Sequence, residues 1–396
     1  MKIRHLLAVC ALTTAPVAAS AQAATHGIVF VDRNGDGIHQ PSEPGLGGVS
    51  VSNQDAVVVT DKTGAFDIGP GPNGLIFVSE PDGYRSVGSF WQVLDTSGRP
   101  MSLALKKVVA PSAFTFVDAS DTHLAPASLP QMQRFRTLVD SVRPDFVMIV
   151  GDLVRDALRV PETEARSYYD MLVHELGAFK VPVKLVPGNH ENFGIETKLS
   201  HVDPANPLFG RAMYHHYFGP DYYSFTRGGV HFVGLNSVDI SGTSYYGHVD
   251  SVQLAWLERD LSHVPAGVPI VTFNHIPMVS STNSFRGYED GPPAPTLITV
   301  NGVTSFRHLV SNASDVLSVL RKHNHVLAIG AHIHAGERIT YITDGIVTRF
   351  EQSPAIVGPS ETPPFTFPAG FVVYAVRAGK IDSGKFIPVS VKDAKR

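Results

Sequence analysis

The stretch VPVKLVPGNHE, residues 181–191, joins an apolar run to a short polar motif. The run Val181–Val186 has the length and the branched side chains of a buried β-strand. Gly188, Asn189, His190 and Glu191 follow where that strand would end. In open α/β sheets, ligands bind outside the carboxyl ends of the strands. The stretch therefore predicts an α/β sheet with a functional site at one edge.

The same arrangement of an apolar run followed by polar residues recurs four times. The motifs are Asp121-Thr122-His123, Gly151-Asp152, Asn274-His275 and His332-Ile333-His334. Apolar residues at helical spacing lie between several of the runs, as in residues 130–142 and 161–176. Alternation of strands and helices predicts an α/β layered core. Residues distant in the sequence would then converge on one site.

The residue types in these motifs suit divalent metal ions, because His offers a neutral nitrogen and Asp and Asn offer oxygens. In an extended segment, residues i and i+2 point to the same side. We therefore expect Asp121 with His123, and His332 with His334, to face one site. Seven candidate ligands exceed the four that one zinc ion takes and fit two ions that share a carboxylate. The candidates are Asp121, His123, Asp152, Asn189, His275, His332 and His334.

The ordered set D-x-H, GD, GNH[DE], H and H-x-H resembles the calcineurin-like metallophosphoesterase superfamily, over residues 114–389. The resemblance implies an α/β fold, a four-layer αββα double β-sandwich, and two divalent metal ions (zinc, manganese or iron). The first ion would be held by Asp121, His123, Asp152 and His334. The second would be held by Asp152, Asn189, His275 and His332. His190 would face the substrate as general acid or transition-state stabiliser.

The implied activity is hydrolysis of phosphate monoesters or diesters by attack of a hydroxide that bridges the two metals. Two positions depart from the family pattern. Ala331 replaces the Gly that usually precedes H-x-H, and Arg155 stands where the purple acid phosphatase branch carries a Tyr that ligates iron. The second departure disfavours the purple, tyrosinate-bound subgroup.

Three alternatives to a general phosphoesterase remain open at this stage: a cyclic-nucleotide phosphodiesterase, a nuclease, and a non-catalytic binding protein on the same fold. The intact ligand set and His190 favour catalysis. Candidate substrate contacts are Arg155, Tyr214 and His215, for which a surface ion pair or simple packing is the competing interpretation. The segment Met278–Leu309, just past His275, is either a lid over the site or a surface excursion.

Residues 1–23 have the layout of a secretory signal peptide: Lys2 and Arg4, an apolar stretch, then small residues. We expect an exported protein, in the bacterial periplasm or secreted, with no transmembrane segment. The net charge is −4 over the chain and −6 after loss of Lys2 and Arg4. An acidic balance favours a small phosphate ester as partner over stable nucleic-acid binding. The sequence carries no signal for an oligomeric state.

Residues 24–109 contain short strand-like runs separated by turn residues, which predicts a small all-β sandwich before the phosphoesterase domain at 110–396. Residues 32–43, DRNGDGIHQPSE, match the calcium-loop pattern D-x-[DN]-x-[DN]-G-x5-E. The candidate calcium ligands are Asp32, Asn34, Asp36 and Glu43. With its flanks, the loop resembles calcium-binding B-type repeats of bacterial surface proteins. The competing interpretation is an Asx-rich turn without an ion.

Overall fold

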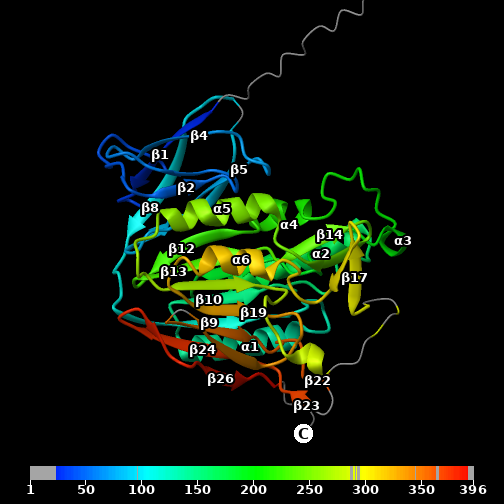
Figure 1. The fold of residues 1–396 in the computed structure, drawn as a ribbon. Coiled ribbons are helices and arrows are strands. Elements are labelled where there is room, and N and C mark those ends of the chain that lie inside the picture. Colours follow the sequence, from blue (N-terminus) through cyan, green and yellow to red (C-terminus); the bar gives the residue numbers. More distant parts are fainter. Residues whose placement is uncertain are drawn as a thin grey trace, which may run out of the picture.

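The computed structural model describes residues 24–95, 97–285, 289, 291, 295–343, 345–362 and 365–390. The predicted signal peptide, residues 1–23, lies outside the described residues. Figure 1 shows a small all-β module, in blue and cyan, packed on a larger body of sheets and helices. None of the helices in the described part of the chain combines the length and apolar character that a membrane-spanning helix needs.

The N-terminal module is a sandwich of two four-stranded sheets. One sheet has the order β4 (Ala65–Ile68), β1 (Thr25–Val31), β8 (Met101–Lys107), β6 (Tyr84–Ser86). The other has the order β3 (Val57–Val59), β2 (Ser50–Ser52), β5 (Leu75–Val78), β7 (Trp91–Val93). Along β8, Met101, Leu103 and Leu105 are buried while Ser102 and Ala104 between them are not fully so. This alternation places one face of each sheet in a shared core and confirms the predicted all-β sandwich.

Two six-stranded sheets form the larger body. The first has the order β11 (Val183–Val186), β10 (Phe146–Val150), β9 (Ala113–Ala119), β24 (Gly370–Arg377), β25 (Lys380–Ile381), with β26 (Lys385–Pro388) also on β24. The second has the order β12 (Tyr223–Arg227), β13 (Val230–Leu235), β16 (Ile270–Asn274), β19 (His325–Gly330), β21 (Ile346–Gln352), β20 (Glu337–Thr343). In the first sheet β11, β10 and β9 run parallel to one another, and β24 runs antiparallel to β9. In the second sheet β13, β16, β19 and β21 run parallel. Every residue of β10, sequence FVMIV, is buried, as expected for a parallel strand covered on both faces.

The helices cover the outer faces of the two sheets. Helices α1 (Leu129–Val142) and α2 (Glu162–Gly177) share a buried cluster with β9 and β10. Helices α5 (Ser251–Ser262) and α6 (Ala313–Leu320) share another with β16 and β19. Between the sheets, Phe116 and Phe146 stack on each other and both contact the edge of Phe232 from the opposite sheet. The four layers confirm the predicted αββα core.

The shorter elements follow the ends of the parallel strands. They are α3 (Thr197–Ser200), α4 (Ala212–Phe218), the 3₁₀ turn η1 (Thr282–Ser284), and the hairpins β14–β15 (Val238–Ser241, Ser244–Gly247), β17–β18 (Leu297–Val300, Val303–Phe306) and β22–β23 (Ser360–Thr362, Phe365–Phe367). In Figure 1, α3, β14, β17 and β22 lie along the right side of the body. The segment Met278–Leu309 thus contains a 3₁₀ turn and a hairpin; Arg286, Tyr288, Pro292 and Pro293 within it lie outside the described residues.

Candidate metal centre

The five motifs meet at one edge of the two sheets, because each follows the carboxyl end of a parallel strand. Asp121 follows β9, Asp152 follows β10, and His275 follows β16. We expected an extended backbone to turn the two outer residues of D-x-H and of H-x-H to the same side, and this expected backbone conformation is wrong. Asp121 and His123 are not extended but left-handed, with φ of 51° and 39°, and His332 and His334 also have positive φ. Left-handed backbone at residues other than glycine is strained and clusters at functional sites.

One group of side chains joins Asp121, His123 and His334. His334 Nε2 lies 3.1 Å from Asp121 Oδ1 and 3.3 Å from His123 Nε2. Ser120 Oγ donates a hydrogen bond to the other carboxylate oxygen, Asp121 Oδ2, at 2.6 Å. Asp121 Oδ1 is buried, and the described residues give it no hydrogen bond of good geometry. A buried anionic oxygen beside two imidazole nitrogens fits a divalent cation.

A second group joins Asp152, Asn189, His275 and His332. His275 Nε2 lies 3.2 Å from Asp152 Oδ1 and 3.2 Å from Asn189 Oδ1. His332 Nδ1 lies 3.2 Å from the same nitrogen of His275. The second oxygen of Asp152, Oδ2, lies 3.7 Å from His123 Nε2 in the first group. The structure therefore brings all seven candidate ligands together, with the Asp152 carboxylate between the two groups.

His190 lies at the rim of this cluster. Its Nδ1 lies 2.6 Å from Arg155 O, and its Nε2 lies 3.7 Å from Asp152 Oδ2. Its ring stands perpendicular to the His123 ring, with centroids 4.6 Å apart, and its side chain is 20% exposed. The backbone carbonyl fixes the ring, so that Nε2 faces the cluster from the solvent side.

Burial and charge set the protonation of the cluster. Burial opposes ionisation of Asp152, but His275 and His190 outweigh it and hold the pKa of that carboxyl well below its usual range. Burial would lower the pKa of His275, but the facing Asp152 raises it to about 9. Burial lowers the pKa of His123 to about 4. A cation requires ionised carboxylates and neutral imidazoles as ligands. Asp152 and His123 are already in these states, and a bound cation would displace the proton that the raised pKa leaves on His275.

Glu191, the last residue of the GNHE motif, positions the two loops that carry Asp152 and Asn189, a role that the sequence analysis did not predict. Its Oε1 accepts hydrogen bonds from Leu153 N and Val154 N, at 2.8 and 3.0 Å, and its Oε2 accepts one from Gly188 N at 2.6 Å. The buried carboxylate thereby ties the loop after Asp152 to the loop that carries Asn189. The sequence feature that could have indicated this role is the acidic residue directly after His190 in the motif.

Of the three candidate substrate contacts, one is exposed and two have partners within the fold. The Arg155 side chain is exposed, and its backbone carbonyl contacts His190. Tyr214 is buried in α4, where it packs against Phe218. His215 Nε2 lies 3.1 Å from the buried Asp221 carboxylate. Tyr214 and His215 therefore have structural partners, and a contact of any of the three with substrate stays a prediction.

The candidate calcium loop is held by its own backbone. Asp32 accepts hydrogen bonds from Gly35 N and Gly37 N, and Glu43 accepts from Arg33 N and Gln40 N. Asn34 donates to Asp36 at 2.9 Å. Among the described residues, the close groups of His and acidic side chains that could hold a metal all belong to the phosphoesterase cluster and do not include this loop.

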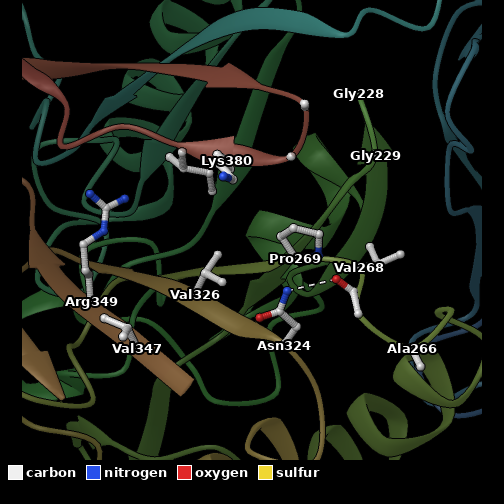
Figure 2. Close-up of a pocket in the computed structure, with 14 residues that line it drawn as sticks. Gly228, Gly229, Ala266, Val268, Pro269, Asn324, Val326, Val347, Arg349 and Lys380 are labelled. Atoms are coloured by element: carbon white, nitrogen blue, oxygen red, sulfur yellow. Dashed lines mark hydrogen bonds between the residues drawn. The ribbon is translucent and has the colours of Figure 1, made fainter. Parts of the chain in front are cut away.

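A cavity of about 820 Å³ lies at the opposite edge of the second sheet. It is lined by the Gly228–Gly229 turn, by Pro269 and Asn324 just before β16 and β19, and by Arg349 and Lys380 (Figure 2). Asn324 Nδ2 donates to Gly267 O at 2.9 Å across its floor. Since β16 and β19 begin here and the motifs with the candidate ligands follow their other ends, this cavity is separate from the cluster.

Residues 114–336, more than half of the chain, match the family model "Calcineurin-like phosphoesterase". The chain belongs to this family. It is a metal-dependent phosphoric ester hydrolase, as the motifs predicted.

Two curated relatives share sequence with the chain. A probable cyclic nucleotide phosphodiesterase of Moraxella catarrhalis (strain BBH18) is 27% identical over 229 residues, which cover 56% of this chain and 71% of the relative. Purple acid phosphatase 23 of Arabidopsis thaliana is 31% identical over 167 residues, which cover 36% of this chain and only 34% of the relative. Among solved structures, a dimetal phosphatase from Danio rerio aligns with a TM-score of 0.45 at 18% identity, covering 70% of this chain and 99% of that one.

Proposed function

We propose that this chain is an exported two-metal phosphoesterase that hydrolyses phosphate monoesters or diesters. The observation that carries the proposal is the position of the Asp152 carboxylate. Its Oδ1 lies 3.2 Å from His275 Nε2 in one group of ligands, and its Oδ2 lies 3.7 Å from His123 Nε2 in the other. A carboxylate shared in this way is what a pair of metal ions requires.

The first ion would be held by Asp121, His123, Asp152 and His334, and the second by Asp152, Asn189, His275 and His332. Two bound divalent cations would acidify a water for attack on phosphorus and neutralise charge on the phosphoryl oxygens. His275 is oriented for its part by Val150 O, 2.9 Å from His275 Nδ1, which leaves Nε2 to face the ion. Asp121 is oriented by Ser120 Oγ. The protein thus supplies ligands whose directions are fixed before substrate binds.

His190 would act on the ester itself. Its Nδ1–H donates to Arg155 O, so Nε2 points toward the cluster, where the phosphate would lie, and the imidazolium form carries a proton there. From there Nε2–H can stabilise a phosphoryl oxygen or protonate the leaving oxygen.

The alternative that a specific observation favours is a cyclic-nucleotide phosphodiesterase. The relative from Moraxella catarrhalis carries that name, with the word probable, and the chain aligns with 71% of it. The purple acid phosphatase relative supports a phosphatase in general, but Arg155 stands where that branch carries its iron-binding Tyr. A nuclease is disfavoured by the net charge of −4.

The test is a panel of aryl monoesters, aryl diesters and cyclic nucleotides, incubated with the full chain after metal removal and after reloading with zinc, manganese or iron. We expect hydrolysis of at least one class only when metal is present. Preference for cyclic nucleotides would select the alternative. A protein that holds two ions and hydrolyses no ester would refute the proposal in favour of a binding protein on the same fold.

Export and calcium binding are separate parts of the proposal. Export is supported by the order of charge, apolar stretch and small residues in 1–23. The amino-terminal sequence of protein recovered from the periplasm or the medium would test it, with cleavage after Ala21 or Ala23 as the expected result. Calcium binding is supported by the match at all pattern positions of residues 32–43. A calcium titration of the wild type and of Asp32→Ala would test it, and equal heats would exclude it.

A further inference from the structure

Three histidines of the cluster have a partner on the remote ring nitrogen, and this partner sets which nitrogen faces the ligand group. For His275 the partner is Val150 O, and for His190 it is Arg155 O. His332 differs, because its Nε2 contacts a side chain: His308 Nδ1, at 2.7 Å. The two rings meet edge to edge and are nearly coplanar, with centroids 4.9 Å apart and an interplanar angle of 22°.

We propose that His308 is a positioning residue for the second metal ion of the proposed centre. In the proposed tautomers His332 Nε2–H donates to His308 Nδ1, 2.7 Å away, which leaves the lone pair of His332 on Nδ1. That nitrogen lies 3.2 Å from His275 Nε2, inside the ligand group. His308 lies on the opposite side of the His332 ring, so it orients a ligand and does not itself reach the ion. The proposal rests on the proposed two-metal function.

The chain around His308 is held in place from several directions. Arg307 N donates to Thr296 O and Gly247 N donates to Arg307 O, each at 2.9 Å. Arg307 is buried, its Nε donates to Tyr245 O at 2.9 Å, and its guanidinium carbon lies 4.2 Å from the centre of the Tyr245 ring. These bonds restrict the backbone on the amino-terminal side of His308.

Tyr245 completes the support. Its ring stands perpendicular to the His332 ring, with centroids 6.0 Å apart at 89°, and lies 6.3 Å from the ring of His308. Arg307, Tyr245, His308 and His332 therefore form one continuous chain of contacts between planar groups. His308 follows the β17–β18 hairpin, so the described part of the segment Met278–Leu309 places its side chain behind the proposed ligand His332.

A ligand histidine that loses its outer hydrogen bond typically loses about 10- to 100-fold in metal affinity. The test is a calorimetric titration of Mn²⁺ into the metal-stripped full chain, for the wild type and three variants. His308→Phe keeps a planar ring but has no acceptor. His308→Asn keeps an acceptor at the same distance along the side chain. His174→Ala, an exposed position on α2, is the control.

We expect two binding steps in the wild type and in His174→Ala. In His308→Phe the affinity of one of the two steps should fall by about 10- to 100-fold while the other is unchanged, and His308→Asn should recover most of the loss. Unchanged affinity of both steps in His308→Phe would refute the role of His308 alone. Loss of both steps together with a lower melting temperature of the metal-free protein would refute it in favour of a structural role. A wild type that takes up fewer than two ions would refute the proposed centre itself.

Discussion

At the scale of the residue, the site depends on which ring nitrogen each histidine presents. His190 and His275 have one nitrogen fixed by a backbone carbonyl and the other turned to the cluster. They differ in depth, because His275 is fully buried while His190 is at the rim. This difference in depth fits the two proposed tasks, which are metal ligation for His275 and contact with the substrate for His190.

His190→Ala should separate these tasks. Removal of a positioned acid should lower kcat by about 100- to 10,000-fold. The metal content should be unchanged, because His190 lies outside the two ligand sets assigned above. Steady-state kinetics on the best ester of the panel, with elemental analysis of the same sample, would check both parts. A variant that loses metal along with activity would instead make His190 a ligand.

Asp152→Asn should affect both metal ions at once. The substitution preserves shape but removes the charge that faces His275 and His123 from the two carboxylate oxygens. We expect a loss of turnover beyond the about 100-fold that outer contacts give, and weaker binding of both ions. Calorimetry with the stripped protein would measure it. Near-normal turnover of the metal-loaded variant would contradict the bridging position.

The sequence predicted which residues come together better than it predicted their local geometry. Residue type and order were sufficient to select Asp121 and His123, yet both have a left-handed backbone that no periodicity rule indicates. His308 carried no signal, because it is separated from His332 along the chain by α6 and β19. Only the folded chain brings the two rings together.

At the scale of the element, the turns after the parallel strands determine the site. Gly188 follows β11, and a Cβ at this position would collide with the backbone nitrogen and the carboxylate of Asp152. Gly151 follows β10 with φ of 76°, and a Cβ there would collide with the ring of His275. Close approach of two strand-end turns is thus a condition for the shared carboxylate.

Gly188→Ala should therefore damage the site more than the fold. Crowding of this kind costs about 1–3 kcal/mol of stability, and the displaced Asp152 should weaken binding of both metals. Gly177→Ala, at the end of α2 with open space around its Cβ position, is the matched control and should leave metal binding intact. Chemical denaturation and metal titration of both variants would decide. Wild-type metal affinity in Gly188→Ala would show that the turn adapts.

Strand existence was predictable from apolar runs such as Phe146–Val150, and the order of the motifs placed them at strand ends. The pairing of strands into two sheets was not readable from the runs. It depends on packing contacts between segments that are distant in the sequence, such as the contact of Phe116 with Phe232. The β17–β18 hairpin was likewise not predicted, because its segment, Met278–Leu309, was interpreted only as a lid over the site or as a surface loop.

At the scale of the whole molecule, the N-terminal module is joined to the phosphoesterase body by buried polar contacts. Trp256 Nε1, in α5, donates to Ser52 Oγ at 3.0 Å, and Gln54 Nε2 donates to the buried Asp221 at 2.7 Å. Glu80 and Lys184 form an ion pair at 2.7 Å, with both side chains 7% exposed. The module is therefore a fixed part of the molecule. The sequence predicted a change of pattern near residue 110 but no contact across it, because charges that pair across an interface resemble ordinary surface charges.

Breaking the Glu80–Lys184 pair should destabilise the protein strongly. Glu80→Gln leaves the Lys184 ammonium buried between the rings of Phe90 and Phe225 without its anion, which costs about 3–5 kcal/mol. Asp55→Asn breaks an exposed pair with Arg259 across the same interface and should cost less than about 1 kcal/mol. Urea denaturation at pH 7 would compare them. Equal effects would mean that burial does not strengthen the inner pair.

The same pair predicts how this difference depends on pH. Burial alone would raise the pKa of Glu80, but Lys184 outweighs it and lowers the pKa from 4.5 to about 2. A lowered folded-state pKa means that the stabilisation is fully present above pH 4.5 and is lost as the pH falls toward about 2. The difference in unfolding free energy between wild type and Glu80→Gln should thus be constant from pH 7 to 5. It should then shrink by about 3 kcal/mol at lower pH, since each pKa unit corresponds to about 1.4 kcal/mol. Because the substituted glutamine does not titrate, the contributions of the other acidic groups cancel in this comparison. A difference in unfolding free energy that stays constant down to pH 3 would show that Lys184 does not lower the pKa of Glu80.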